Sequence, residues 1–208
     1  MPRNSSQITI KLEAADCFVP RNDIMKNTIS ILKLTLLLIV LLAVIYPMII
    51  WGIAQAAPNS GKGETISANG KVVGYQKIGQ KFDKSNYFWG RPSAVDYNAA
   101  GSAGSNKGPS NADYLAVVQK RIDTLLLVHP YLQKSDIPAD MVTASGSGLD
   151  PNISPEGALI QVKRIAKERK LSEEQVKRLV ENKIYKPNLV GTSFVNVLEL
   201  NIELDKLK

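Results

Sequence analysis

The sequence predicts an α+β protein, with one N-terminal transmembrane helix followed by a single small soluble α+β domain. The first observation is an uncharged apolar run from Leu34 to Ala57, after which the chain is mostly polar. A helix rises about 1.5 Å per residue, so roughly 20 apolar residues cross a hydrocarbon core of about 30 Å. The second is that residues 64–208 contain both alternating and helical apolar patterns, over a length that suits one domain.

The N-terminal flank and helix are expected over residues 25–57, with the membrane span over about 34–56. Leu34 begins the apolar part, and Trp51 lies where aromatic residues anchor a helix at the interface. Pro47 is expected to bend the helix. A cleaved signal peptide is the alternative, because Ala54-Gln55-Ala56 resembles a cleavage site. The apolar part of a signal peptide is normally only about 7–15 residues long, which favours an uncleaved anchor.

Basic residues around the span predict its orientation. Arg21, Lys26 and Lys33 precede it, and Lys62 is the basic residue close behind it. By the positive-inside tendency, the N-terminus is cytoplasmic and residues 58–208 are extracytoplasmic. The expected location is therefore the plasma membrane, crossed once.

The first 24 residues differ from the rest of the chain and include its one cysteine, Cys17. They are either a short cytoplasmic extension or sequence upstream of a natural start at Met25. Because no cysteine follows the span, the domain can form neither a disulfide nor a thiolate metal site. Residues 58–63 are rich in Pro, Gly and Ser and are expected to form a linker.

The charge of the soluble part is modestly basic. Residues 58–208 carry 21 Lys and Arg against 16 Asp and Glu, a net charge of +5. This balance favours an acidic partner or anionic lipid. It does not indicate nucleic-acid binding, because no run of basic residues is interleaved with aromatic side chains.

The first elements of the domain follow from turn and capping signals. Residues 71–78 are expected to form a strand after the turn dipeptide Asn69-Gly70. Residues 83–110 read as a long loop that contains several aromatic residues, and long loops in compact domains are often functional. A helix is expected from Ser110 or Asn111 to His129-Pro130.

The C-terminal half is expected to contain two more helices and a strand. One helix begins at Ser154-Pro155 and presents its apolar side chains at helical spacing, namely Leu159, Val162, Ile165 and Ala166. The other begins at Ser172, with Gln175 completing a capping box. Residues 198–204 alternate apolar and polar side chains, which predicts a half-buried strand.

The sequence gives no support for catalysis or for a metal site. His129 is the only histidine and lies beside a proline, so a structural role is expected. Asp140 and Asp150 are expected to serve turns or caps rather than to form an acid–base pair. Residues 145–148 resemble a nucleophile elbow only superficially, because loop flanks them on both sides.

Residues 104–111 raise the question of nucleotide binding. They place glycines, Lys107 and Ser110 just before a helix, whose N-terminus favours phosphate. The order differs from a Walker loop, in which Gly-Lys-Ser/Thr runs directly into the helix. An ordered surface loop is the alternative.

From Met25 to Lys208 the chain resembles the C subunit of the bacterial high-affinity potassium pump, the KdpC family of the Kdp P-type ATPase. The motifs that carry the resemblance are residues 87–94, 104–111, 142–155 with Gln161 and Arg164, and 196–201. The resemblance implies an accessory, non-catalytic subunit of an ATP-driven potassium importer. Its partners would be a channel-like potassium-binding subunit, a P-type ATPase subunit and a very small membrane subunit.

The family is described as needed for assembly and as a catalytic chaperone that raises the ATP affinity of the ATPase subunit. An extracytoplasmic domain cannot reach cytoplasmic ATP, so its effect would be allosteric. No firmly bound cofactor is expected, and ATP would act through the partner. If the domain were cytoplasmic, the candidate nucleotide contacts would be Lys107, Ser110, Ser145, Ser147 and Gln161.

The aromatic segment is a candidate docking surface for a partner, because Trp, Tyr and Arg dominate interface energetics. Its residues are Tyr87, Phe88, Trp89 and Arg91. A satellite core beneath the long loop is the alternative. Without the resemblance, a membrane-anchored structural envelope protein and an exported hydrolase also stay open.

Overall fold

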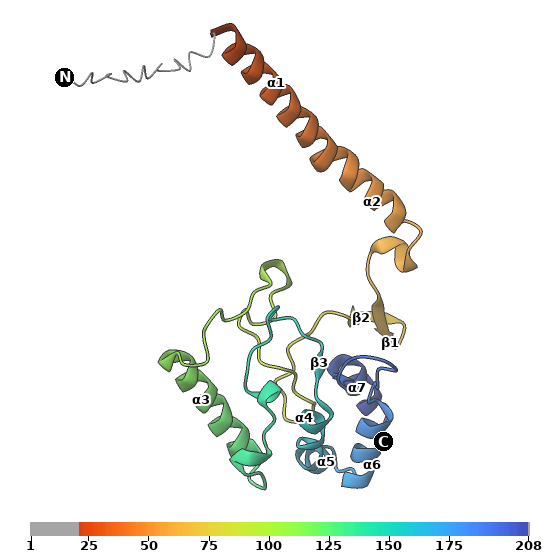
Figure 1. The fold of residues 1–208 in the computed structure, drawn as a ribbon. Helices are drawn as coiled ribbons and strands as arrows, with labels where there is room; N and C mark the ends of the chain where they lie inside the picture. Colours follow the sequence, from red (N-terminus) through yellow and green to blue (C-terminus); the bar gives the residue numbers. More distant parts are fainter. Residues whose placement is uncertain (1–20, 208) are drawn as a thin grey trace, which may run out of the picture. The chain divides into compact units, whose positions relative to one another are not determined.

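The computed structural model describes residues 21–207, with side chains from residue 25 onward (Figure 1). The predicted N-terminal extension and Cys17 lie outside the described residues, apart from the backbone of 21–24. The chain divides into two compact units between Gly61 and Lys62, within the stretch expected to be a linker. Each unit is described by itself.

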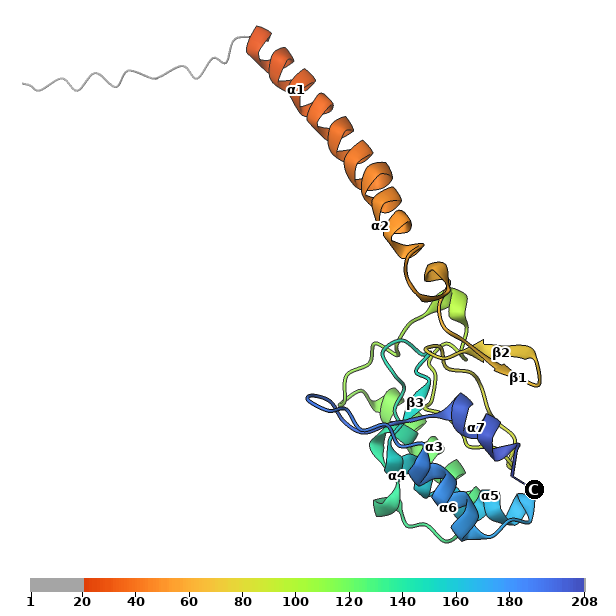
Figure 2. The same ribbon diagram turned by 90° about the vertical axis from the view of Figure 1, so that its right-hand side faces the viewer.

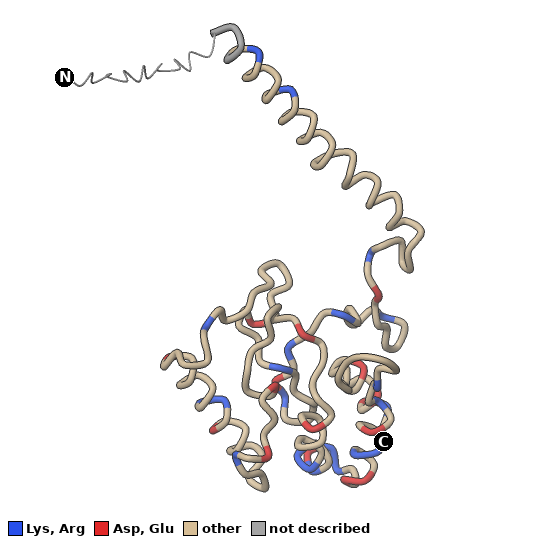
Figure 3. Tube along the Cα trace, in the orientation of Figure 1, with Lys and Arg blue, Asp and Glu red and all other residues tan. Residues whose placement is uncertain are grey.

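The first unit is a long apolar helix. It comprises α1 (Arg21–Val40), a π-helical turn η1 (Leu41–Ile45) and α2 (Tyr46–Ala54). The stretch Met25–Ala54 has 30 residues and a mean hydropathy of 2.7 in its most apolar window. It is therefore long and apolar enough to span a membrane. Figure 3 shows basic residues near its N-terminal end and none along the apolar length.

The π-helical turn ends two residues before Pro47. Pro47 has no N–H for the carbonyl of the preceding turn, and its ring needs space there. The N–H of Tyr46 donates instead to the carbonyl of Leu41, five residues earlier. This wider turn accommodates the proline within a continuous helix.

The second unit opens with a hairpin. Strand β1 (Thr65–Ala68) pairs antiparallel with β2 (Lys71–Tyr75). Asn69 and Gly70 join them with φ of 51° and 74°, which is the geometry of a type I′ turn. The strand predicted over 71–78 is therefore confirmed, although it ends at Tyr75.

The next segment is irregular, as the sequence predicts, apart from the 3-10 turn η3 (Ala99–Gly101). It leads into α3 (Ala112–Val128), where Asn111 Oδ1 accepts a hydrogen bond from the Tyr114 N–H at 3.0 Å. Two 3-10 turns, η4 (Lys134–Asp136) and η5 (Ala139–Met141), follow the helix. Of the two caps expected, Ser110 and Asn111, the structure has Asn111, and the predicted end of α3 at His129 is confirmed.

The helix predicted from Ser154-Pro155 divides into α4 (Pro155–Leu159) and α5 (Val162–Arg169). The backbone N–H of Gln161 donates to Ala158, three residues earlier, at 3.1 Å. The side chain of Gln161 donates to the Gly157 carbonyl at 2.9 Å, in place of its own backbone N–H. This substitution interrupts the regular helix, and Leu159 lies exposed instead of in the core. Helix α6 (Glu173–Asn182) has the predicted Ser172–Gln175 capping box.

The strand predicted over 198–204 is wrong. Strand β3 (Asn152–Ile153) pairs with β4 (Val195–Asn196), and helix α7 (Val197–Leu204) follows. Asn196 caps this helix, accepting from the Glu199 N–H at 3.1 Å. The buried side chains of α7 follow helical spacing, namely Val197, Leu198, Leu200, Asn201 and Leu204. An apolar alternation this short suits either a strand or a helix, and burial along one helix face, together with the Asn196 cap, favours the helix.

The core of the domain lies between α3 and the cluster of α4 to α7 (Figures 1 and 2). It also takes one residue of the irregular segment, Phe88, whose side chain is fully buried. The other fully buried large apolar side chains are Ile165, Val176, Val180, Val195, Leu200 and Leu204. The irregular segment is thus built into the core, where its backbone N–H and C=O groups need hydrogen-bond partners.

Candidate functional site

Two side-chain amides hold the backbone of Phe88 and Trp89. Asn201 on α7 accepts from the Phe88 N–H at 2.9 Å and donates to its carbonyl at 3.0 Å. Gln161 accepts from the Trp89 N–H at 2.8 Å and donates to its carbonyl at 3.1 Å. These cyclic pairs replace the pairing that a neighbouring strand would give, so the segment enters the core without unsatisfied groups at either residue.

A buried arginine, Arg164 on α5, lies beneath this segment. Its guanidinium donates to His129 Nε2, the carbonyls of Ser85 and Tyr87, and Gln161 Oε1. It also stacks over Trp89, 4.6 Å from the ring centroid. Burial lowers the pKa of Arg164 to about 10, so it remains charged at neutral pH. No carboxylate among residues 25–207 forms an ion pair with it. Its positive charge is stabilised by hydrogen bonds to neutral acceptors instead.

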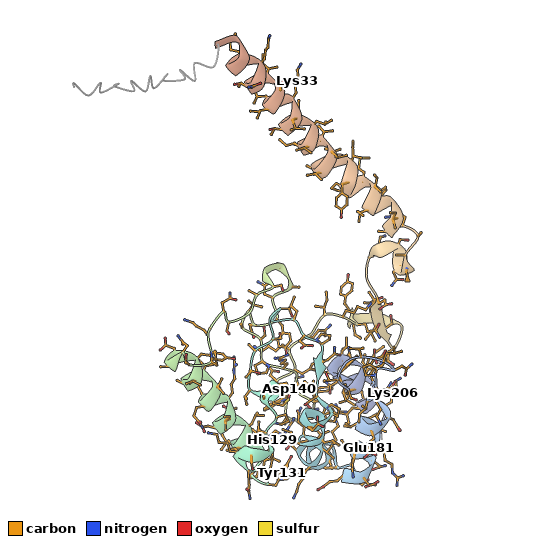
Figure 4. All side chains as sticks on the ribbon, in the orientation of Figure 1. Lys33, His129, Tyr131, Asp140, Glu181 and Lys206 are labelled. Atoms are coloured by element: carbon orange, nitrogen blue, oxygen red, sulfur yellow. The ribbon has the colours of Figure 1, made fainter. Side chains whose placement is uncertain are left out.

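His129 completes the network from the end of α3. Its Nδ1 donates to the Leu125 carbonyl at 2.9 Å, because Nε2 accepts from Arg164 at 2.9 Å. The ring is fully buried and meets the rings of Trp89 and Tyr131 edge-on. Figure 4 shows His129 and Tyr131 near the end of α3. Burial lowers the pKa of His129. Both ring nitrogens are engaged within the fold, which is the structural role that the sequence predicts.

The four docking candidates differ in how far they are buried and in which residues they contact. Phe88 is fully buried, so the expectation that its side chain belongs to a docking surface is wrong. Tyr87 is half-buried beneath Arg169, whose guanidinium lies 4.7 Å from the ring centroid. Trp89 is half-buried too, and its indole N–H donates to the Lys84 carbonyl at 2.9 Å. The segment is therefore core on one side and surface on the other.

Arg91 lies at the rim of this surface. It pairs with Asp150 at 3.2 Å and donates to the Thr143 carbonyl at 3.3 Å. Together with Trp89, it borders an open cavity of about 390 Å³ against α3. Trp89 and Arg91 are each half-buried, and the exposed part of each side chain is accessible to a partner.

Gln161 has no hydrogen-bonding atom free for a nucleotide. Its oxygen accepts from the Trp89 N–H and from Arg164, and its nitrogen donates to the carbonyls of Trp89 and Gly157. The side chain is also fully buried. This corrects the expectation that Gln161 contacts a base or ribose, because such a contact would require the network to open.

The two serine candidates are used within their own loop. Ser145 is buried, and its hydroxyl accepts from the Gly148 N–H at 2.9 Å. The Ser147 hydroxyl accepts from the Leu149 N–H at 3.1 Å. Gly148 has φ of +66°, and an added Cβ would lie 2.8 Å from the Ala103 carbonyl oxygen. The serine–glycine loop is therefore shaped by its own hydrogen bonds and by close packing.

The structure brings the two candidate phosphate loops together. Ser102 donates to the Ser147 carbonyl at 2.9 Å, and a Cβ at Gly104 would lie 3.1 Å from the Gly146 oxygen. Lys107 and Ser110 are exposed beyond this contact. The first turn of α3 is capped by Asn111. The loops adjoin, but Lys107 and Ser110 do not converge with Gln161, which is buried.

Asp140 and Asp150 have the capping and turn roles that the sequence predicts. Asp140 accepts from the N–H of Ser154 at 2.7 Å and from its hydroxyl at 3.1 Å, which positions the cap of α4. Asp150 accepts from the Asn152 N–H at 3.0 Å and pairs with Arg91. Among residues 25–207 no three His, Cys, Asp or Glu side chains gather in a way that could hold a metal ion.

A family model described as "KdpC: K+-transporting ATPase, c chain" matches residues 28–206. The chain belongs to the KdpC family. The potassium-transporting ATPase KdpC subunits of Flavobacterium psychrophilum and Flavobacterium johnsoniae are each 80% identical over 184 residues, which cover 88% of this chain and 100% of each relative. The KdpC subunit of Phocaeicola vulgatus is 53% identical over 189 residues, with 88% and 100% covered. The resemblance drawn from the motifs is thus confirmed at the level of the family.

Sequence reasoning about this KdpC chain missed the clamp by Asn201 and the pairing of His129 with Arg164. Two signals were present in the sequence. At helical spacing Asn201 interrupts an otherwise apolar set of positions in residues 197–204, and Gln161 and Arg164 lie three residues apart on the helix predicted from Ser154. Polar side chains on a buried face need partners, which here are the backbone of residues 85–89 and His129.

Proposed function

We propose that this chain is the accessory C subunit of an ATP-driven, high-affinity potassium import pump and does not itself catalyse ATP hydrolysis. The observation that carries the proposal is the family match over residues 28–206. The apolar helix Met25–Ala54 adds a means of joining a membrane complex, since none of its most apolar window is buried within the chain. Its partners would be the channel-like potassium-binding subunit, the P-type ATPase subunit and the small membrane subunit.

We place the soluble domain on the extracytoplasmic side. The support is the excess of basic residues before the span, where Lys26 and Lys33 lie, over Lys62 behind it. On that side the domain would meet the outer face of the channel-like subunit. It would stabilise the assembly or affect potassium entry there, and the half-buried Trp89 and Arg91 offer one contact surface.

The chaperone role would then be allosteric. An extracytoplasmic domain cannot contact cytoplasmic ATP. The subunit would therefore raise the ATP affinity of its partner by binding one state of the pump more tightly than another. The engagement of Gln161 and Ser145 within the fold supports this indirect route. Direct contact with ATP is the competing proposal, and it requires a cytoplasmic domain.

The test compares pump complexes assembled with and without this chain. We expect loss of the chain to abolish growth at very low potassium only, and to raise the KM for ATP of any residual complex. Growth that is equally impaired at high potassium would instead favour a structural envelope protein. Turnover of a substrate by the isolated full chain would favour an exported hydrolase.

A further inference from the structure

The cavity of about 390 Å³ between Trp89 and α3, called the α3 cavity below, is lined by basic and neutral residues only. Its α3 wall is one helix face, with positions i, i+3, i+4, i+7 and i+8 occupied by Val117, Lys120, Arg121, Thr124 and Leu125. Arg91 adds a third positive charge from the irregular segment, and no carboxylate lines the cavity.

Two of the three positive charges have no carboxylate partner. Arg91 pairs with Asp150 at 3.2 Å, whereas Lys120 and Arg121 form no ion pair with a described residue. The Arg121 guanidinium donates to the neutral Val142 carbonyl at 2.9 Å. The α3 cavity is therefore electropositive, and its charge is complementary to an acidic group.

This charge is particular to the α3 cavity. Arg91 also borders a wider cavity on its other side, where four carboxylates line the wall, namely Asp136, Asp140, Asp150 and Glu156. The two cavities that share Arg91 thus differ in the sign of their charge, and a partner that distinguishes them must be charged itself.

The inner part of the α3 cavity is apolar. Leu125 and Met141 are buried, Trp89 is half-buried, and Val117 on α3 is 45% exposed. The basic side chains are more exposed than this floor, since Lys120 is exposed and Arg121 half-buried. An apolar floor with a basic rim suits an apolar side chain that has a carboxylate beside it.

The wall opposite α3 is fixed in advance. Tyr97 has φ of 60°, a conformation that bulky residues rarely adopt, and such strain clusters at binding sites. Ser93 Oγ accepts from the Tyr97 N–H at 2.9 Å, and the Tyr97 hydroxyl donates to the Arg91 carbonyl. A Cβ at Gly90 would lie 2.8 Å from the Tyr97 hydroxyl oxygen. A wall held this closely loses little entropy on binding.

We infer that the α3 cavity binds an acidic segment of another pump subunit, with an apolar side chain on the floor and a carboxylate beside Lys120 and Arg121. This inference rests on the proposed function, which supplies the partner. A second copy of this chain is disfavoured, because residues 58–208 carry a net charge of +5. A phospholipid with two acyl chains is disfavoured by size, because the cavity is near the lower end of the range of about 300–1,000 Å³ for ligand pockets.

Reversal of one rim charge tests the inference. Lys120 and Lys186 are both exposed, and Lys186 lies outside the α3 cavity, so Lys186→Glu is the matched control for Lys120→Glu. Each tagged full-length chain is expressed with the other pump subunits, and their recovery in mild detergent is measured. We expect Lys120→Glu to reduce recovery about tenfold and Lys186→Glu to leave it within about twofold. Equal recovery for the two variants would overturn the inference.

A carbodiimide, which joins an amine to an adjacent carboxylate, identifies the occupant in native membranes. We expect a link from Lys120 Nζ of the wild-type chain to an Asp or Glu of another pump subunit. Lys120→Arg keeps the charge and removes the amine, so it should lose the link and keep recovery within about twofold. An anionic lipid as occupant would leave no such link. Its absence from the wild-type chain, or a link from Lys120 to a second copy of this chain alone, would overturn the inference.

The wild-type chain separates this inference from the proposed function. If the wild-type chain recovers the other pump subunits while the Lys120 tests fail, the proposed function stands and the inference fails. If it recovers none of them, both fail.

Discussion

The side-chain amide of Gln161 forms a cyclic pair of hydrogen bonds with the backbone of Trp89, at 2.8 and 3.1 Å. The pair does for one residue of an irregular segment what a neighbouring strand does for a regular one. Because Gln161 also accepts from Arg164, it joins the segment, α5 and the buried charge into one network. The aromatic surface around Trp89 is therefore positioned by buried polar groups and by packing together.

Replacement of Gln161 tests that network. Gln161→Ala leaves both backbone groups of Trp89 and one donor of Arg164 without partners, so we expect a loss of about 2–4 kcal/mol in the free energy of unfolding. Urea unfolding of the full chain in detergent, followed by tryptophan fluorescence, measures the loss. Gln119→Ala, at an exposed position on α3, is the control and should change the value by less than about 0.5 kcal/mol. Equal values for the two variants would show that the pair contributes nothing.

The stability of the domain should depend on pH through His129. Burial lowers its pKa in the folded state, so the unfolded chain takes up the proton more readily. The contribution of His129 is fully present above the ordinary histidine pKa of about 6.5 and declines as the pH falls through the lowered value. Protonation would also remove the acceptor that Arg164 uses.

Urea unfolding between pH 7 and pH 5 measures this dependence. Because His129 is the only histidine, His129→Asn should flatten the profile over that range. A wild-type stability that stays constant or rises on acidification would contradict the assignment of a buried neutral ring.

The helical form of residues 197–204 predicts unequal effects within the apolar alternation. Leu200 is fully buried, so Leu200→Ala should cost about 2–5 kcal/mol. Ile202 lies half-buried on the side of the helix, and Ile202→Ala should cost less than half as much. In a strand both residues would share one face and the costs would be similar. Urea unfolding of the two variants decides between these patterns.

Docking through the aromatic surface predicts a loss of assembly for Trp89→Ala. The variant removes the half-buried ring that borders the cavity against α3. We expect weaker recovery of the pump complex in mild detergent. Because Arg164 stacks on this ring, the unfolding curve of the variant must be measured in parallel. Unchanged recovery with a folded domain would exclude a docking role for Trp89.

The sequence was informative where a few neighbouring residues carry the signal. The long apolar run, the Asn69-Gly70 turn, the Asn111 cap and the Ser172–Gln175 capping box each occur as predicted. Local chemistry is sufficient in these cases, because turns and caps are decided by a few neighbouring residues.

The remaining features depend on contacts between distant residues. Alternation over residues 198–204 suits a strand as well as a short helix, and burial on one helix face settled it. The hydrogen bond from Gln161 to Gly157 divides α4 from α5, and the division follows from the pairing with Trp89, 72 residues away. Burial of Phe88 likewise depends on its distant clamp, Asn201. No window of the sequence contains both partners of such a pair.

Sidedness is the most direct test of the central claim that the domain is extracytoplasmic and acts on ATP indirectly. Cys17→Ser combined with Ser110→Cys places one thiol at an exposed position of the domain, and intact cells are treated with a membrane-impermeant thiol reagent. The wild-type chain, whose single thiol Cys17 precedes the span, is the control and should react only after lysis. We predict labelling of the Ser110→Cys chain without lysis. Labelling of that chain only after lysis would place the domain in the cytoplasm and contradict the account.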